Sequence, residues 1–286
     1  MINFLPYCFD ILRATDRDRY ISVLFAPKKK RRALAALYAF NAEVSRIRES
    51  VHDPLIGEIR LRWWYDSIAD GEIQKSENNP ILSDLVAAMT LFNLSKTDFL
   101  RYCDAQILDL YHNPIATLCD LESYCAETAS IILQLSCQIL DFEAAQNFTD
   151  AYKHGGVAQG LSGVLRLLSF MRSRYHYYLP ADVLKAVAVE RDELEANHVS
   201  DVQKRHIIEA IVALSQDHYT KFYKHFGTLP RTLKPAFLPL AIIPASLQKS
   251  LQMGAEVFQE NTTLPLLHRY WLITKAAMSS NLPKPL

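Results

Sequence analysis

Glycine is scarce in this sequence, with only 8 among 286 residues. An all-β protein needs many glycine-containing turns between short strands, so this scarcity argues against a β-sheet architecture. No convincing strand alternation is present. Apolar residues instead recur at helical spacing, for example at Ala36, Leu37, Phe40, Val44 and Ile47. Half of the residues are hydrophobic, which is enough for a substantial core, and we therefore expect an all-α fold.

A net charge is also lacking, because Lys+Arg and Asp+Glu both number 31. Proteins that bind nucleic acid usually carry a basic excess, so we expect no nucleic-acid partner. The one dense basic run, Lys28–Arg32, follows Pro27 and is interpreted as the polar start of a helix. A contact with a lipid headgroup or with RNA is the alternative for this run.

Long apolar runs and targeting signals are missing as well. No run of 18 apolar residues occurs, so no transmembrane helix is expected. The N-terminus lacks a signal-peptide core, and Asp10, Asp16 and Asp18 are atypical of a transit peptide. We therefore expect a cytoplasmic protein, with a peripheral contact at the inner face of the membrane left open. The 5 cysteines follow no zinc spacing and are expected to be buried free thiols, so no metal site is predicted.

Proline and polar clusters divide the helical pattern into segments, but no linker is long or biased enough to separate two domains. One domain over residues 1–286 is therefore expected. The predicted helices cover about 7–14, 17–24, 28–51, 54–71, 80–91, 96–111, 119–140, 145–170, 181–188, 201–225, 236–243 and 245–257.

Four of the 8 glycines lie in one segment, residues 153–163. No Lys-Ser/Thr pair closes this segment, so it is not a phosphate-binding loop. Gly156, Gly160 and Gly163 are spaced i, i+4, i+7 and fall on one helical face. Each glycine costs a helix about 1 kcal/mol, so something must approach this face closely. Another helix and a ligand in a central cavity both satisfy that requirement.

Several stretches, in this order and spacing, resemble the squalene/phytoene synthase family. They are Asp16–Tyr20 with Leu24–Pro27, Ala36–Phe40, Arg60–Asp66, Asp120–Ala126, and Arg166 followed by Tyr178–Pro180. The resemblance covers about the first two thirds of the chain. It implies a single-domain, isoprenoid-synthase-like bundle of α-helices around a deep central cavity, bordered by residues 33–50 and 153–171. Active members of the family condense two prenyl diphosphates head to head.

The family holds Mg²⁺ on two Asp-x-x-x-Asp motifs, because the departing pyrophosphate must be neutralised. The matching positions of the first motif are Ser45 and Glu49, with Arg46 where a further aspartate is usual. The second motif reads Leu167 and Met171, which cannot hold Mg²⁺. The resemblance therefore implies no catalytic residue, and Mg²⁺ as a cofactor only if the chain is an active prenyl transferase with rearranged ligands.

Gly160 and Gly163 stand where the family has Gln and Asn, and Leu167 and Met171 are expected to make one cavity wall apolar. The resemblance thus implies a hydrophobic or isoprenoid ligand whose anionic head is held by arginines. Alternatively, Arg166 pairs with a carboxylate and is structural. The expected ligand-binding residues are Arg46, Glu49, Arg62, Gly156, Gly160, Gly163, Arg166 and Tyr178.

A narrower resemblance is to the degenerate branch of this family known as a mitochondrial complex I assembly factor. The residues that carry it are 40–44, 49–51, 153–160 and 261–266. It implies a pseudoenzyme that helps to assemble respiratory complex I, with complex I subunits or other assembly factors as partners. A lipid-binding or isoprenoid-binding protein, and an active synthase acting on farnesyl or geranylgeranyl diphosphate, remain the alternatives.

Overall fold

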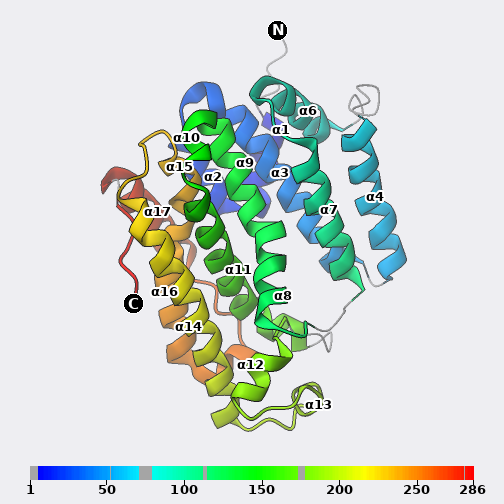
Figure 1. The fold of residues 1–286 in the computed structure, drawn as a ribbon, viewed down its shortest axis with the longest axis vertical. Coiled ribbons are helices and arrows are strands. Elements are labelled where there is room, and N and C mark those ends of the chain that lie inside the picture. The colour runs from blue at the N-terminus through cyan, green and yellow to red at the C-terminus, as the bar shows by residue number, and fades with distance from the viewer. Residues whose placement is uncertain (1–5, 52, 71–78, 112–114, 173–177, 280) are drawn as a thin grey trace.

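The computed structural model describes residues 6–51, 53–70, 79–111, 115–172, 178–279 and 281–286, except for the side chains of Pro6, Met171 and Arg172. The regular elements in these ranges are all helices, as the sequence predicts (Figure 1). They are α1 (Pro6–Thr15), α2 (Arg17–Leu24), α3 (Lys28–Ser50), α4 (Pro54–Asp70), α6 (Pro80–Phe92), α7 (Lys96–Leu110), α8 (Leu118–Cys125), the π-helical segment η1 (Ala126–Ser130), α9 (Ile131–Leu140), α10 (Phe142–Gln146), α11 (Thr149–Arg172), α12 (Ala181–Ala186), α13 (Arg191–Glu195), α14 (Asp201–Phe226), α15 (Lys234–Phe237), the 3₁₀ segment η2 (Leu238–Ile242), α16 (Ile243–Met253), the 3₁₀ segment η3 (Gly254–Phe258) and α17 (Leu266–Ser279).

Capping residues in the sequence set several helix boundaries. The Asp16 side chain accepts a hydrogen bond from the backbone N–H of Arg19 at 3.0 Å and starts α2. Ser200 and Gln203 form a reciprocal capping box at the start of α14. Asn93, with φ of 50°, ends α6 in the left-handed conformation that asparagine tolerates. These local signals explain why most of the predicted boundaries are confirmed to within a few residues.

Helix α11 lies inside the bundle, where it packs against α14, α9 and η1 (Figure 1). Helix α3 packs against α1, α6 and α9, while α4 lies at the edge and packs mainly on α7. A continuous apolar core runs through the bundle. Phe40 lies at its centre, with Trp64 at 5.2 Å, Phe99 at 5.7 Å and Tyr102 at 5.5 Å between ring centroids.

The predicted helix over 119–140 is interrupted by η1, which separates α8 from α9. The predicted helix over 145–170 corresponds to α11, which begins at Thr149, and the short helix α10 precedes it. Three helices were not predicted, namely α10, α13 and α17. Gly254 adopts φ of 54°, so α16 ends at Met253 and a 3₁₀ turn follows rather than a longer helix.

Two further expectations can be compared with the structure. Within the residues that the structure describes, no helix is long and apolar enough to cross a membrane. Cys8, Cys103, Cys125 and Cys137 are buried free thiols as expected, whereas Cys119 is exposed. Burial raises the pKa of the Cys125 thiol to about 12, so this thiol stays protonated and unreactive at neutral pH.

Candidate functional site

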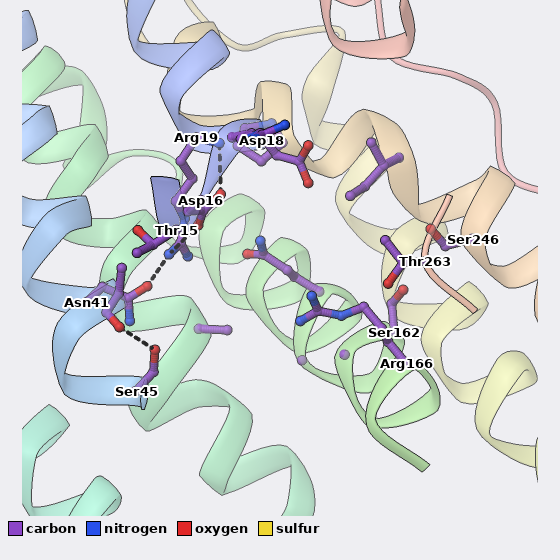
Figure 2. A pocket seen from close by; sticks show the side chains of 18 of the residues that line it. Thr15, Asp16, Asp18, Arg19, Asn41, Ser45, Ser162, Arg166, Ser246 and Thr263 are labelled. Carbon is purple, nitrogen blue, oxygen red and sulfur yellow. Dashed lines mark hydrogen bonds and ion pairs between the residues drawn. The ribbon is translucent and has the colours of Figure 1, made fainter. Parts of the chain in front are cut away.

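A cavity of about 710 Å³ lies between α3 and α11, within the size range typical of small-molecule sites (Figure 2). This position confirms the central cavity expected from the sequence. Apolar residues of η2, α16 and α17 form part of the wall, including Ile242, Ile243 and Leu266. The polar residues that line it are Thr15, Asp16, Arg17, Asp18, Arg19, Asn41, Ser45, Arg46, Glu49, Gln106, Thr128, Gln159, Ser162, Arg166, Ser246, Ser250, Thr262, Thr263 and Arg269.

The structure brings the predicted residues of α3 and α11 together around this cavity. Ser45, Arg46 and Glu49 line it from α3. Gly160, Gly163 and Arg166 line it from α11. Ser45 donates only a long hydrogen bond, at 3.5 Å, to the carbonyl oxygen of Ala42 one turn earlier in the same helix.

Three other predicted residues are not among those that line the cavity. Arg62 lies on α4, where its guanidinium pairs with Glu58 at 3.5 Å and with Asp104 at 3.7 Å. Gly156 lies against Ser130 of η1. Tyr178 is buried and donates its hydroxyl hydrogen bond to Asp109.

The glycine face of α11 packs closely on another segment at one end and borders the cavity at the other, so both explanations of the glycine spacing apply. A Cβ atom added at Gly156 would lie 2.4 Å from the Cα of Ser130, and one at Gly160 would lie 2.4 Å from the Sγ of Cys125. These two glycines therefore let α11 approach the α8–η1 segment closely. Gly163 has no neighbouring atom within 4 Å of such a Cβ, and it opens onto the cavity.

The apolar wall expected at Leu167 and Met171 needs correction. Leu167 packs, partly buried, against the apolar core and is not among the residues that line the cavity. The Met171 side chain lies outside the described residues. The lining of the cavity is mostly polar, because α2, α3 and α11 all direct charged or amide side chains toward it (Figure 2).

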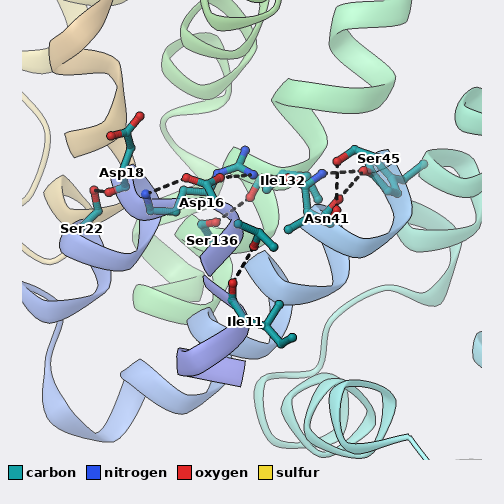
Figure 3. A network of polar contacts seen from close by, with 12 residues as sticks. Ile11, Asp16, Asp18, Ser22, Asn41, Ser45, Ile132 and Ser136 are labelled. Atoms are coloured by element: carbon teal, nitrogen blue, oxygen red, sulfur yellow. Dashed lines mark hydrogen bonds and ion pairs between the residues drawn. The ribbon is translucent and has the colours of Figure 1, made fainter. Parts of the chain in front are cut away.

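A polar network that sequence reasoning missed connects α2 with α3 and α7 (Figure 3). Arg19 Nη1 lies 3.5 Å from Asp16 Oδ2 and donates to Asn41 Oδ1. Asn41 in turn donates to the hydroxyl of Tyr102, and the Arg19 guanidinium lies 5.0 Å from the Tyr38 ring centroid. Asp16 and Asn41 lie in stretches that carry the family resemblance, and that resemblance could have indicated both residues as part of the site.

A second interaction that the sequence analysis did not predict is an ion pair between α2 and α17. Arg269 Nη1 donates to Asp18 Oδ2 at 2.7 Å, and both side chains are mostly buried. Burial raises the pKa of the Asp18 carboxyl, while Arg269 and Arg166 oppose that rise. Asp18 Oδ1 and Arg269 Nε are buried without a hydrogen-bond partner among the described residues. A polar ligand in the cavity could supply partners for these two atoms.

A buried carboxylate positions another residue of the lining, Tyr124. Asp109 accepts hydrogen bonds from Arg48 at 3.2 Å, from the Tyr124 hydroxyl at 3.2 Å and from the Tyr178 hydroxyl. The rings of Tyr124 and Tyr178 stack with centroids 5.5 Å apart, and the Arg48 guanidinium lies 4.6 Å from the Tyr178 ring centroid. Tyr178 therefore supports the cavity indirectly.

The charge of the lining does not fit a magnesium cluster. Its described residues include five arginines, at 17, 19, 46, 166 and 269, against the carboxylates of Asp16, Asp18 and Glu49. Two of these carboxylates already pair with arginines. Mg²⁺ requires several hard oxygen ligands in octahedral geometry. Across the described part of the chain, no group of three or more His, Cys, Asp or Glu side chains could hold a metal ion.

Comparisons with known proteins agree with this architecture. The family described as squalene/phytoene synthase matches residues 12–268. One relative is the NADH dehydrogenase (ubiquinone) complex I assembly factor 6 of Rattus norvegicus. It is 28% identical to this chain over 265 residues, which are 91% of this chain and 79% of that protein. A presqualene diphosphate synthase from Sinorhizobium fredii (strain NBRC 101917 / NGR234) is 25% identical over 166 residues, 58% of each protein.

The fold also matches solved structures. A dehydrosqualene synthase crystallised with a ligand superposes with a TM-score of 0.81, covering 96% of this chain and 95% of that one. The sequence identity is 18%, so this likeness concerns the fold alone. It is consistent with the helical bundle described above.

Proposed function

This chain belongs to the squalene/phytoene synthase family, and we propose that it is a non-catalytic member that binds an anionic ligand in its cavity and assists the assembly of respiratory complex I. The observation that carries the first part is the excess of arginines over carboxylates in the cavity lining, five against three. The second part rests on the likeness to the rat assembly factor, which extends over 91% of this chain.

Arginine side chains are suited to hold an anionic group without a metal ion. A guanidinium presents paired N–H donors that match the oxygens of a phosphate or a carboxylate. Arg46 lies on α3 and Arg166 on α11, so the two cations reach the cavity from different helices. We infer that an anionic head lies between them and that a less polar portion of the ligand lies toward Ile242 and Ile243.

Condensation of prenyl diphosphates is disfavoured by the same residues. Negative charge develops on the departing diphosphate, and stabilisation of developing charge is usually the largest catalytic contribution, with one lost donor costing about 10²–10³ in rate. Ser45 and Leu167 replace metal-ligand positions, and the cation at Arg46 repels Mg²⁺.

The catalytic part of the proposal is tested by incubating the purified protein with farnesyl or geranylgeranyl diphosphate and Mg²⁺ or Mn²⁺. An active relative is assayed in parallel. We expect neither hydrocarbon product nor released pyrophosphate. Turnover that the substitution Glu49→Ala abolishes would contradict the proposal.

The ligand-binding part is tested by native mass spectrometry of the purified protein, followed by extraction of any retained small molecule. An anionic molecule is expected in the wild type and is expected to be lost from Arg46→Ala and Arg166→Ala. Arg62→Ala is the matched control, because Arg62 is also exposed but does not line the cavity. Equal retention by all three variants would place the ligand elsewhere.

The assembly role is tested by deleting the gene in the source cells and separating membrane complexes on native gels. Loss of assembled NADH dehydrogenase is expected, with recovery when the wild-type gene is returned. Recovery by the Arg46→Ala variant would separate the assembly role from ligand binding. Normal assembly in the deletion strain would contradict the role.

An active prenyl transferase with rearranged ligands is the second candidate. It is favoured by Asp16, Asp18 and Glu49, whose carboxylates line the cavity, and by the likeness to presqualene diphosphate synthase. The turnover assay above distinguishes it from the first proposal. We also propose that residues 1–286 form one domain, since one core cluster includes residues from Cys8 to Leu282.

A further inference from the structure

Helix α17 carries a second apolar face that points away from the bundle. Leu272, Ile273 and Ala276 are buried against the protein. On the opposite side, Leu267, Trp271 and Met278 are exposed to 81%, 55% and 80%. The spacing i, i+4, i+11 places these three side chains on one stripe along the helix. Figure 1 shows α17 at the edge of the bundle, on the side of the C-terminus.

Basic side chains lie beside this apolar stripe. Lys275 Nζ lies 4.6 Å from the ring centroid of Trp271, and the His268 ring centroid lies 6.2 Å from it. The sequence of α17 contains no aspartate or glutamate. Asp18, which contacts Arg269, approaches the helix from its inner side, in the cavity. The outward side of α17 therefore combines apolar and basic side chains.

The elements beside α17 continue the same pattern. Helix α17 packs against η2 and α2. The η2 segment contains no acidic residue, whereas α2 carries Asp18, which contacts α17 on its inner side. Helix α15, which packs on η2, contains no acidic residue either. A hollow of about 150 Å³ next to its C-terminal half is lined by Phe25, Arg231 and Lys234, with no acidic residue among its described lining. The chain contains no acid between Asp217 and Glu256 or after Glu260, although its net charge is zero. The charged side chains of residues 218–255 and 261–286 are therefore all basic.

Another exposed apolar stripe carries charges of both signs. On α4, Ile59 and Trp63 are exposed to 63% and 40% on the side away from the core. That helix carries Glu58, Asp66 and Asp70 together with Arg60 and Arg62, and Arg62 pairs with Glu58. An anionic surface is therefore attracted less to α4 than to α17, which has no acidic residue.

We propose that the outward face of α17 docks onto an anionic phospholipid surface. Apolar side chains with a tryptophan enter the boundary between headgroups and acyl chains, and cations beside them are attracted to anionic lipids. No acidic side chain of α17, η2 or α15 opposes such an approach. This inference is independent of the cavity ligand and of the proposed assembly role. The docking face consists of Phe25, Arg231, Lys234, Leu267, Trp271, Lys275 and Met278.

The test is flotation of the purified full chain with vesicles of two compositions. One contains phosphatidylcholine alone, and the other contains about one quarter phosphatidylglycerol, to supply negative surface charge. Binding is expected only to the anionic vesicles and is expected to weaken as salt is raised. Binding that is absent from both, or equal for both, would overturn the proposal.

Substitutions test whether the contact with the vesicle surface lies on α17. Lys275→Ala is expected to weaken binding about fivefold, as one cation near an anionic surface contributes about that much. Leu267→Ser with Met278→Ser is expected to weaken it about tenfold or more, since both apolar contacts are lost. Ile59→Ser on α4 is the matched control, because Ile59 is also exposed but lies between Glu58 and Arg60 on a helix of mixed charge, and its binding should equal that of the wild type.

Tryptophan emission provides a second readout, because Trp271 is one of 3 tryptophans. A blue shift with anionic vesicles is expected in the wild type and in Trp63→Phe, but not in Trp271→Phe. The α17 variants are first checked for native circular dichroism and unfolding midpoint. If folded α17 variants still bind vesicles as the wild type does, the proposal fails. It also fails if vesicles never bind and the face instead retains a protein partner.

Discussion

Arg269 donates a hydrogen bond to Asp18 at 2.7 Å and so joins the last helix to the second across 251 residues of sequence. The Arg269 and Asp18 side chains are only 19% and 13% exposed. The pair closes the cavity between α2 and α17, and it fixes the inner side of α17. The same contact therefore leaves the apolar stripe of α17 directed outward.

Removing Arg269 should destabilise the protein strongly, because it leaves the Asp18 carboxylate buried beside an empty position. For Arg269→Met we expect a loss of about 3 kcal/mol in the free energy of unfolding, measured by urea denaturation at neutral pH. Adding Asp18→Asn to that variant should recover part of the loss, since the buried charge is then absent.

Arg62→Met is the control for this prediction. Arg62 is 47% exposed and its ion pairs lie at the surface, so we expect a change within about 0.5 kcal/mol. If Arg269→Met were no more destabilising than Arg62→Met, the buried pair would not contribute as proposed.

The three glycines on one face of α11 should respond differently to the same substitution. Gly156→Ala places a Cβ atom 2.5 Å from the backbone nitrogen of Ser130, and the backbone of η1 must move to admit it. We expect a loss of about 2–3 kcal/mol from such overpacking. Gly163→Ala meets nothing within 4 Å and should gain up to about 1 kcal/mol from improved helix propensity.

Urea denaturation of the two alanine variants measures this difference directly. Gly160→Ala should be intermediate, because its closest contact is the Cys125 Sγ atom rather than the backbone. A Gly156→Ala variant as stable as Gly163→Ala would show that η1 and α11 do not pack as closely as described.

Most of the helices could be predicted because one-sided apolar periodicity and capping residues are local properties. Helix α17 escaped prediction for a physical reason. Leu267, Trp271 and Met278 are apolar but face solvent, so apolar residues surround the helix and conceal the pattern. The π-helical turn at Ala126–Ser130 was also hidden, because its five residues continue the apolar helical pattern predicted over 119–140 without a proline or glycine to mark a break.

The site was predictable only where a motif specified the position. Ser45, Arg46 and Glu49 were placed in the cavity by the family's motif spacing, and they line it. Arg269 was not found, because its partner Asp18 is distant in sequence and no periodicity relates the two. Leu167 follows the motif register, yet it is partly buried against the core and is not among the residues that line the cavity, because the register fixes its position on α11 but not its neighbours from other helices.

A histidine pair outside the cavity predicts a loss of stability in acid. His154 Nδ1 and His218 Nδ1 lie 3.0 Å apart, and His218 Nε2 lies 3.1 Å from Glu122 Oε1. Burial, followed by the charge of His218, lowers the pKa of His154. The stability that neutral His154 provides is therefore present above its unfolded pKa, about 6.5, and is lost as pH falls below it.

Thermal unfolding at several pH values tests this pair. The midpoint of the wild type should fall more steeply than that of His154→Ala between about pH 7 and pH 5, because the variant lacks the group that must charge. His206→Ala, which removes a histidine from the same α14 helix as His218, is the control. Parallel midpoints for wild type and His154→Ala would contradict the prediction.

Asp109 should make the opposite contribution to the pH dependence. Burial raises the pKa of this carboxyl to about 6, although Arg48 and Tyr124 oppose the rise. The unfolded chain releases this proton near pH 4, so between about pH 4 and pH 6 only the folded state holds it. The contribution of Asp109 to stability is therefore greatest below pH 4 and is lost as pH rises through 6, by about 3 kcal/mol in total. In Asp109→Asn that slope should disappear, because an asparagine side chain does not titrate. Urea denaturation of both proteins at intervals from pH 4 to pH 7 gives the two slopes, and equal slopes would show that Asp109 titrates normally in the folded protein.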